Sequence, residues 1–377
     1  MTLRSKWSLI SGVIIVLCIA VNLVNNHAGS SFMAACMLLV VWGCCVVYLN
    51  ECRNDSFQEI SEVLLASGIG YGIVFVVAFL LLQFGIDIPG VATSVRLEPG
   101  MIMQQSNMYQ NQLINLFRLR GFTIDPNTMI APFLYSTVVA MLRIAKKKGG
   151  LKEAATIVLS AMCIFFSNSR MGLICFCVII VGSIILGYKI ASPRIRNYIK
   201  AGFLVVSFLL MIAAVTTDLI SGLANMVISV YANRSGLMDE YGRFSIWTDA
   251  LSVWWDNNIL FGIGLGQMQY YTATSRACHN TWLELICGCG IVVGLPFIVH
   301  FGALIAKGLR FGMNMRNAQE SEFALTMLLG IIGVMLSLLS VDNVTFSYLW
   351  FGSSVVAAVL RGCCYNGSHG ITSTSIQ

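Results

Sequence analysis

Charged residues are scarce in this sequence. Asp, Glu, Lys and Arg together make up 11% of its 377 residues, whereas hydrophobic residues make up 57%. A soluble domain carries roughly 25% charged residues, so this chain has too few of them to cover a surface that faces water. The composition therefore excludes an ordinary soluble protein and predicts an integral membrane protein.

Apolar runs long enough to cross a bilayer recur along the whole chain. Such a helix needs about 20 residues, and the apolar positions here are continuous rather than alternating, which favours helices over barrel strands. We predict an all-α fold with about ten transmembrane helices, in a single polytopic domain over 1–361, and a disordered cytoplasmic tail over 362–377. The predicted spans are 7–24, 31–49, 62–86, 128–145, 151–167, 171–188, 201–217, 281–306, 323–341 and 344–360.

Motifs of several other protein classes are missing. No G-x-x-x-x-G-K-S/T sequence occurs, and the predicted cytoplasmic loops are too short for a nucleotide-binding domain, so an ATP-driven pump is not expected. The 13 cysteines mostly lie inside apolar runs and lack the two-pair spacing of a zinc site. The predicted outer loops hold no Asp-x-Asp pair for a divalent metal. We therefore expect no metal, no cofactor and no nucleic-acid partner.

Lysine is missing from one side of the predicted topology. If the N-terminus is cytoplasmic, sixteen of the 23 basic residues fall on that side, and the other side receives seven arginines and no lysine. By the positive-inside rule, we predict that both termini are cytoplasmic and that two large loops, at about 87–127 and 218–280, lie on the outer side. Guanidinium groups can neutralise a pyrophosphate through bidentate contacts, without a metal. The outer arginines are Arg96, Arg118, Arg120, Arg170, Arg234, Arg243 and Arg276.

The second large loop contains an amphipathic segment. Its large apolar residues recur at helical spacing, which predicts a helix lying in the outer membrane interface, where tryptophan is common. These residues are Phe244, Trp247, Leu251, Trp254 and Trp255. Arg243 begins the segment, at the end of the helix where the dipole favours an anion and disfavours a cation. An anion bound to Arg243 would remove this conflict. An ordinary packing helix and a headgroup-binding arginine are the alternatives.

Three glycines, Gly262, Gly264 and Gly266, follow this segment. They predict a tight turn that exposes the backbone. Since no strand precedes them, they do not indicate a dinucleotide site.

His279 lies directly before the predicted span 281–306. Thr281 and Glu284 have the spacing of a capping box, so this helix is expected to begin near Thr281. The positive end of a helix disfavours imidazolium, so His279 is expected to be neutral and able to accept a proton near pH 7. The same helix end attracts phosphate. A purely structural histidine is the alternative.

Further arginines lie at the outer ends of predicted spans. Arg170 ends the short hairpin Ser167-Asn168-Ser169-Arg170, and an arginine at this depth is costly unless it is paired. Arg118 and Arg120 come before the fourth span, which Asp125-Pro126-Asn127 is expected to open as a turn and helix start. Each arginine is a candidate for binding an anion, and the alternative is contact with lipid headgroups or solvent.

Taken together and in order, these motifs resemble the O-antigen ligase and polymerase family of bacterial polysaccharide enzymes. The motifs are Ser169-Arg170-Met171-Gly172, Arg243 with Trp247, Gly262-Ile263-Gly264-Leu265-Gly266, His279-Asn280-Thr281-Trp282-Leu283-Glu284 and Gly290-Ile291-Val292-Val293-Gly294. One departure is Asn257-Asn258, where such proteins often carry a proline before the paired glycines.

The resemblance implies a C-type glycosyltransferase of the bacterial inner (cytoplasmic) membrane that acts on the periplasmic face without a metal. Its donor and acceptor would be undecaprenyl-pyrophosphate-linked glycans, and a chain-length regulator protein would be a partner besides membrane lipids. Arg170 and Arg243 would bind the donor pyrophosphate, and His279 would act as general base or position the acceptor hydroxyl. The expected substrate-binding residues are Arg118, Arg120, Arg276 and Asn280.

Two alternatives remain at this point. The motifs do not separate a polymerase, which extends one lipid-linked chain with another, from a ligase, which transfers the chain to lipid A core; the polymerase is our preferred interpretation. A transporter would need ionisable residues in mid-span. Glu284 and His300 come nearest, but Glu284 is expected to cap a helix and His300 to hydrogen-bond a neighbouring helix.

Overall fold

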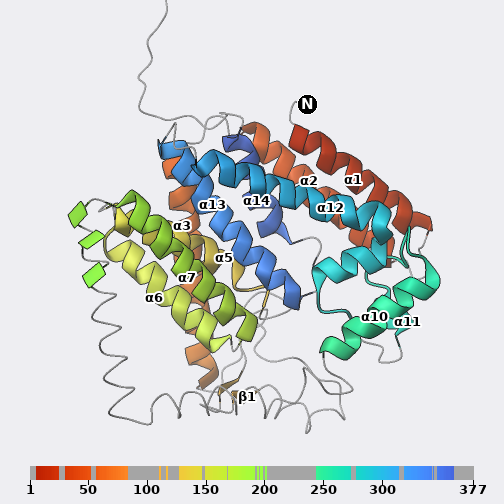
Figure 1. Cartoon of the computed structure of the whole chain (residues 1–377). Helices are drawn as coiled ribbons and strands as arrows, with labels where there is room; N and C mark the ends of the chain where they lie inside the picture. Colours follow the sequence, from red (N-terminus) through yellow and green to blue (C-terminus); the bar gives the residue numbers. More distant parts are fainter. Residues whose placement is uncertain are drawn as a thin grey trace, which may run out of the picture.

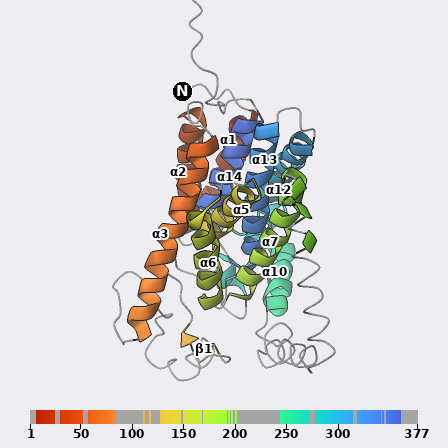
Figure 2. The same ribbon diagram turned by 90° about the vertical axis from the view of Figure 1, so that its left-hand side faces the viewer.

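A computed structural model of the chain, drawn in Figures 1 and 2, describes residues 6–24, 30–51, 57–83, 110–111, 116–117, 127–146, 149–167, 169–191, 193–194, 196–197, 200–201, 243–272, 277–313, 318–341, 343 and 346–360. Most of the predicted periplasmic loop 87–127, residues 218–242 and 273–276 of the second predicted periplasmic loop, the predicted span 201–217 beyond its first residue, and the predicted tail 362–377 lie outside these ranges.

The regular secondary structure of the described chain is helical apart from one short pair of strands. The helices are α1 (Lys6–Val24), α2 (Ser30–Glu51), α3 (Phe57–Gln83), α5 (Ala131–Ala145), α6 (Leu151–Phe166), α7 (Arg170–Ile190), α10 (Arg243–Asn257), α11 (Met268–Tyr271), α12 (Thr281–Met313), α13 (Ala318–Ser337), the 3-10 helix η1 (Leu338–Ser340) and α14 (Ser347–Val359). The strands β1 (Gln110–Asn111) and β2 (Leu116–Phe117) pair antiparallel, with Gln110 opposite Phe117.

These helices fit an integral membrane protein. Every predicted span other than 201–217 coincides with one of them. Within the described ranges, five are long and apolar enough to cross a bilayer: Lys6–Val24, Phe57–Ala78, Met171–Ile190, Thr281–Met313 and Glu320–Ser340. Their outer faces carry exposed aliphatic side chains, such as Val16 (61% exposed) and Ile185 (58%). Such a surface suits lipid rather than water. The number of spans and their orientation stay predictions.

The helices form two groups that meet on α13 (Figures 1 and 2). Helices α3, α5, α6 and α7 pack against one another, and α5 and α7 also contact α13. On the other side, α12 and α14 contact α13, while α1 and α2 pack together and against α12 and α14 respectively. The short helices α10 and α11 lie against α12.

Tyr135 fills the place where α5, α13 and α14 meet. Its side chain is 1% exposed, and its hydroxyl donates a hydrogen bond to the Tyr348 carbonyl at 3.1 Å. A Cβ atom at Gly330 would lie 2.3 Å from the Tyr135 ring, and one at Gly352 would lie 2.0 Å from its hydroxyl. The two glycines therefore leave the room that the phenol occupies, as small residues do between membrane helices.

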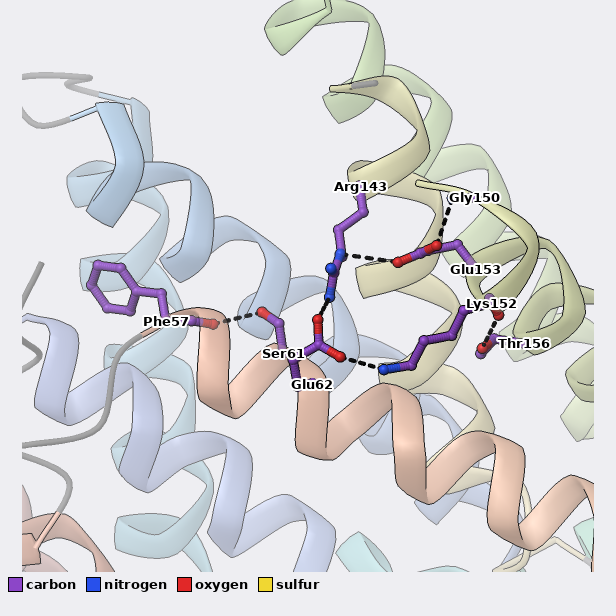
Figure 3. Close-up of polar contacts among 8 residues, drawn as sticks. All are labelled: Phe57, Ser61, Glu62, Arg143, Gly150, Lys152, Glu153 and Thr156. Carbon is purple, nitrogen blue, oxygen red and sulfur yellow. Dashed lines mark hydrogen bonds and ion pairs between the residues drawn. The ribbon is translucent and has the colours of Figure 1, made fainter. Parts of the chain in front are cut away.

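Ion pairs join four helices at one end of the bundle (Figure 3). Arg143 Nη1 lies 2.5 Å from Glu62 Oε1, and Arg143 Nε lies 3.1 Å from Glu153 Oε1. Lys152 pairs with the second oxygen of Glu62. Lys146, which Figure 3 does not draw, pairs with Glu322 on α13. This is the end where the sequence predicts the cytoplasm.

Candidate functional site

Helix α12 is broken at Gly290, which has φ 68° and ψ −178°. The break separates a first helical part, which begins at Thr281, from a longer second part, and it frees backbone groups that a continuous helix would pair. The sequence predicted one continuous span here. Gly288, Gly290 and Gly294, which stand close together inside the span, are the signal that could have indicated the break.

The glycine-rich segment after α10 supplies the missing hydrogen-bond partners. Ile263 N and Gly264 N donate to the carbonyls of Cys287 and Gly288, at 3.1 and 2.8 Å. In return, the backbone nitrogens of Ile291 and Val292 donate to the carbonyls of Ile259 and Leu260, at 3.0 and 3.1 Å. A broken helix is tolerated in a membrane protein when such partners satisfy its backbone. The predicted turn therefore does expose its backbone, and the exposed groups form hydrogen bonds with the backbone of α12.

Only glycine fits the closest contacts of this pairing. A Cβ atom at Gly262 would lie 2.4 Å from the Gly288 carbonyl oxygen, and one at Gly290 would lie 2.1 Å from the Leu260 oxygen. Gly262, Gly264 and Gly266 also have positive φ angles of 70°, 101° and 69°. These are conformations that residues with a side chain rarely adopt.

Two buried polar side chains hold the next residues of the segment. Asn22 Oδ1, on α1, accepts a hydrogen bond from Leu265 N at 2.7 Å, and Glu284 Oε1 accepts one from Gly266 N at 2.6 Å. Asn22 is 0% exposed and Glu284 is 4% exposed. Asn22 was not predicted as a site residue, because an asparagine near the end of an apolar span carries no distinctive pattern.

The start of α12 was predicted correctly, but its cap was not. Helix α12 begins at Thr281, and the capping side chain is Asn280, whose Oδ1 accepts hydrogen bonds from Trp282 N and Leu283 N at 3.1 and 3.2 Å. Thr281 Oγ1 instead donates to the Val341 carbonyl at 2.5 Å, and Glu284 binds Gly266 as described. A substrate-binding role for Asn280 stays a prediction.

His279 lies at the mouth of this helix, as the sequence predicted. It directly precedes the capping Asn280, and its side chain is exposed. Its φ angle of 50° is the only positive value among the described non-glycine residues. Such a conformation costs about 1–3 kcal/mol and persists only where the surroundings impose it, often at functional sites.

Helix α10 connects Arg243 to the His279 region. Arg243 is the first residue of α10, as predicted, and is half-buried. One turn later, Trp247 Nε1 donates a hydrogen bond to the carbonyl of Cys278, the residue before His279, at 3.1 Å. Helix α10 and the stretch that leads into α12 are thereby fixed to each other, as Figure 1 shows for the two elements.

The predicted apolar residues of α10 divide between packed and exposed positions. Its fully buried residues are Ile246 and Ala250, and Trp247 and Trp254 pack beside them against Ile263, Met268, Cys278 and Cys287. Phe244, Leu251 and Trp255 are 50%, 43% and 68% exposed. These three exposed side chains are available for contact with lipid.

Arg170 is the first residue of α7. Ser169 caps this helix: its Oγ accepts a hydrogen bond from Gly172 N at 2.8 Å and donates one to Asn127 Oδ1, just before α5. The structure describes the backbone of Arg170 but not its side chain. Convergence of Arg170, Arg243 and His279 on one substrate therefore stays a prediction. The predicted substrate-binding residues Arg118, Arg120 and Arg276 lie outside the described residues.

Across the described part of the chain, no group of three or more His, Cys, Asp or Glu side chains could hold a metal ion. The described cysteines are free thiols, and the sulfurs of Cys18 and Cys289 lie 3.6 Å apart between α1 and α12.

Comparisons with known proteins confirm the resemblance over part of the chain. Residues 155–298 match the family model of O-antigen ligase. This range includes Arg170, Arg243, His279 and the break in α12. It supports a membrane enzyme of the O-antigen ligase and polymerase type, connected with polysaccharide synthesis. A search of the curated proteins finds no match.

Among solved structures, the one described as "Structural coordination of polymerization and crosslinking by a peptidoglycan synthase complex" is similar. It has a TM-score of 0.47 and 14% sequence identity, over 97% of this chain and 100% of that chain. This degree of likeness carries no argument about function.

Proposed function

We propose that this protein, whose residues 155–298 match the O-antigen ligase family, joins undecaprenyl-pyrophosphate-linked oligosaccharide repeat units into a surface polysaccharide. The reaction would take place on the periplasmic face of the bacterial inner membrane, without a metal. The observation that carries the proposal is the fixed arrangement of His279, at the mouth of α12, beside the helix that begins with Arg243.

In the proposed reaction, the acceptor hydroxyl oxygen bonds to the anomeric carbon of the donor glycan as the bond from that carbon to pyrophosphate breaks. The hydroxyl proton goes to His279, and undecaprenyl pyrophosphate leaves with the electron pair. The guanidinium groups of Arg170 and Arg243 would stabilise the charge that grows on the leaving pyrophosphate. Fixed cations in a site that holds little water act strongly on such developing charge.

The broken helix supports this role because it fixes the position of His279. The first part of α12 is attached to the glycine-rich segment through backbone hydrogen bonds, and Glu284 and Asn22 attach that segment to α12 and α1. The exposed His279 is therefore held on a rigid support. A general base held in this way contributes roughly 10²–10⁴-fold to a rate.

The test uses purified protein, lipid-linked repeat units and single variants. We expect Arg170→Ala and Arg243→Ala to lower polymer formation roughly 10²–10³-fold, as the loss of a transition-state contact does, and His279→Ala roughly 10²–10⁴-fold. Lys189→Ala is the matched control, because Lys189 lies in the last turn of α7, whose first residue is Arg170. Full activity of both arginine variants would refute the assignment.

A second candidate is an O-antigen ligase that transfers the glycan to lipid A core. The description of the matching family as O-antigen ligase favours it. The same assay separates the two: long chains from lipid-linked repeat units alone identify a polymerase, whereas a reaction that requires core lipid identifies a ligase.

A transporter of lipid-linked sugars is the alternative from another class. His300 Nε2 has no hydrogen-bond partner within the described residues, so the expected bond to a neighbouring helix is not found for that atom. Uptake into proteoliposomes that depends on His300 but not on His279 would favour transport over the enzyme.

A further inference from the structure

An apolar groove runs between α1 and the second part of α12, away from the glycine-rich segment. It has a volume of about 900 Å³, within the range of about 300–1,000 Å³ that is usual for ligand pockets. Val13 on α1 and Pro296 and Val299 on α12 are among the aliphatic residues that line it. Both helices are candidate membrane spans, so the groove opens on the hydrocarbon region of the bilayer.

The charges of the groove all lie at one of its ends and have one sign. Lys6, the first residue of α1, and Lys307, near the end of α12, both line it, and both side chains are exposed. No acidic side chain occurs among its described lining residues. Two cations at the mouth of an apolar groove between membrane helices match the phosphate of an anionic lipid whose acyl chains enter the groove.

Two aromatic side chains next to this mouth, the buried Trp7 and the half-buried His300, each have a ring nitrogen without a hydrogen-bond partner among the described residues. Trp7 is 7% exposed, and neither Trp7 Nε1 nor His300 Nε2 has a partner within the described ranges. The two rings lie 6.0 Å apart between centroids, and both residues line the groove. A buried polar group without a partner is energetically unfavourable. The ester carbonyls of a glycerophospholipid would lie just below its phosphate and offer the acceptor that the Trp7 indole lacks.

We propose that this groove is a binding site for an anionic diacyl phospholipid in the leaflet next to the start of α1, predicted to be the cytoplasmic one. The phosphate lies between Lys6 and Lys307, and the acyl chains lie along Val13 and Val299. The site is separate from the proposed glycosyltransferase site, and it does not depend on which sugar reaction the protein performs.

The test measures the thermal unfolding of the purified full chain in detergent, with added phosphatidylglycerol or with phosphatidylcholine of the same acyl chains. A ligand that binds the folded state raises the midpoint in proportion to the logarithm of its concentration once binding is saturated. We expect phosphatidylglycerol to raise the midpoint and phosphatidylcholine to have a much smaller effect.

Two variants and a matched control decide the outcome. We expect Lys6→Gln/Lys307→Gln to lose the rise caused by phosphatidylglycerol, and Val299→Phe to lose it by filling the groove. Val299 is 57% exposed, so the larger ring has room outside the core. Lys189→Gln/Lys200→Gln removes the same charge from residues that do not line the groove, and it should keep the rise. Equal shifts with both lipids, or a full shift in the Lys6/Lys307 variant, would overturn the proposal, as would stabilisation of wild type by neither lipid.

Discussion

Helices α5 and α12 both run through the bundle, but different groups hold them in place. The buried side chains of α5, with Tyr135 at the centre, pack into neighbouring helices, and its backbone pairs within its own helix. The middle of α12 instead exchanges backbone hydrogen bonds with the segment around Ile259–Gly264. Packing of a regular helix tolerates small changes of side chain. The backbone pairing between α12 and this segment, which we call the junction at Gly290, depends instead on residues that have no side chain.

The largest effect is expected from Gly290→Ala. The positive φ angle costs a residue with a side chain about 1–3 kcal/mol, and the new Cβ atom would also lie 2.1 Å from the Leu260 oxygen. We expect a large drop in the thermal unfolding midpoint and loss of polymer formation. Gly302→Ala on the same helix is the control, because a Cβ atom there meets nothing within 4 Å. If both variants behave alike, the junction at Gly290 does not determine stability.

A smaller effect is expected from Gly330→Val, in the packed region around Tyr135 of α5. The valine would press on the Tyr135 ring, and overpacking of a well-filled core costs about 1–3 kcal/mol. We expect a lower unfolding midpoint but normal activity per folded molecule, since Tyr135 is not among the proposed site residues.

Gly70→Val on α3 is the control for this variant, because a Cβ atom at Gly70 meets nothing within 4 Å. A specific loss of activity in Gly330→Val at unchanged stability would contradict the separation between the packed helices and the junction at α12.

The smallest effect is expected from Glu62→Gln in the ion-pair cluster of Figure 3. Glu62 pairs with Arg143 and Lys152, but its side chain is 38% exposed. Partly exposed ion pairs are worth about 0–1 kcal/mol each and are screened by salt. We expect a small drop in the unfolding midpoint at low ionic strength that disappears at high salt. A large drop that persists at high salt would show that the cluster is a main support of the fold.

Much of the candidate site follows from local sequence signals. Arg243 and Arg170 begin their helices, and His279 stands directly before the one that starts at Thr281, where the charge and capping patterns placed them. The local signals did not identify the partner of Glu284. Its spacing from Thr281 fits a capping box, but its carboxylate binds Gly266, eighteen residues earlier in the chain.

The apolar face of α10 shows the same limit. The apolar residues at helical spacing predicted an interfacial helix but not which of its side chains pack inside the protein: Ile246 and Ala250 are buried and Trp255 is exposed. The packed side of the helix lies against Ile263, Met268, Cys278 and Cys287, which come from later in the chain. Hydrophobicity and spacing within α10 carry no information about the shape of that surface.

The sequence by itself determined that the chain is helical and suited to a membrane, and where most of its apolar helices lie. Those properties depend on residues within about 20 positions of one another, because a membrane helix satisfies its own backbone hydrogen bonds. Only the tertiary structure decided that α12 breaks at Gly290, that Asn22 and Glu284 hold the glycine-rich segment, and that Tyr135 occupies the space left by two glycines. Each of these depends on a partner far away in the chain, so no local pattern specifies it.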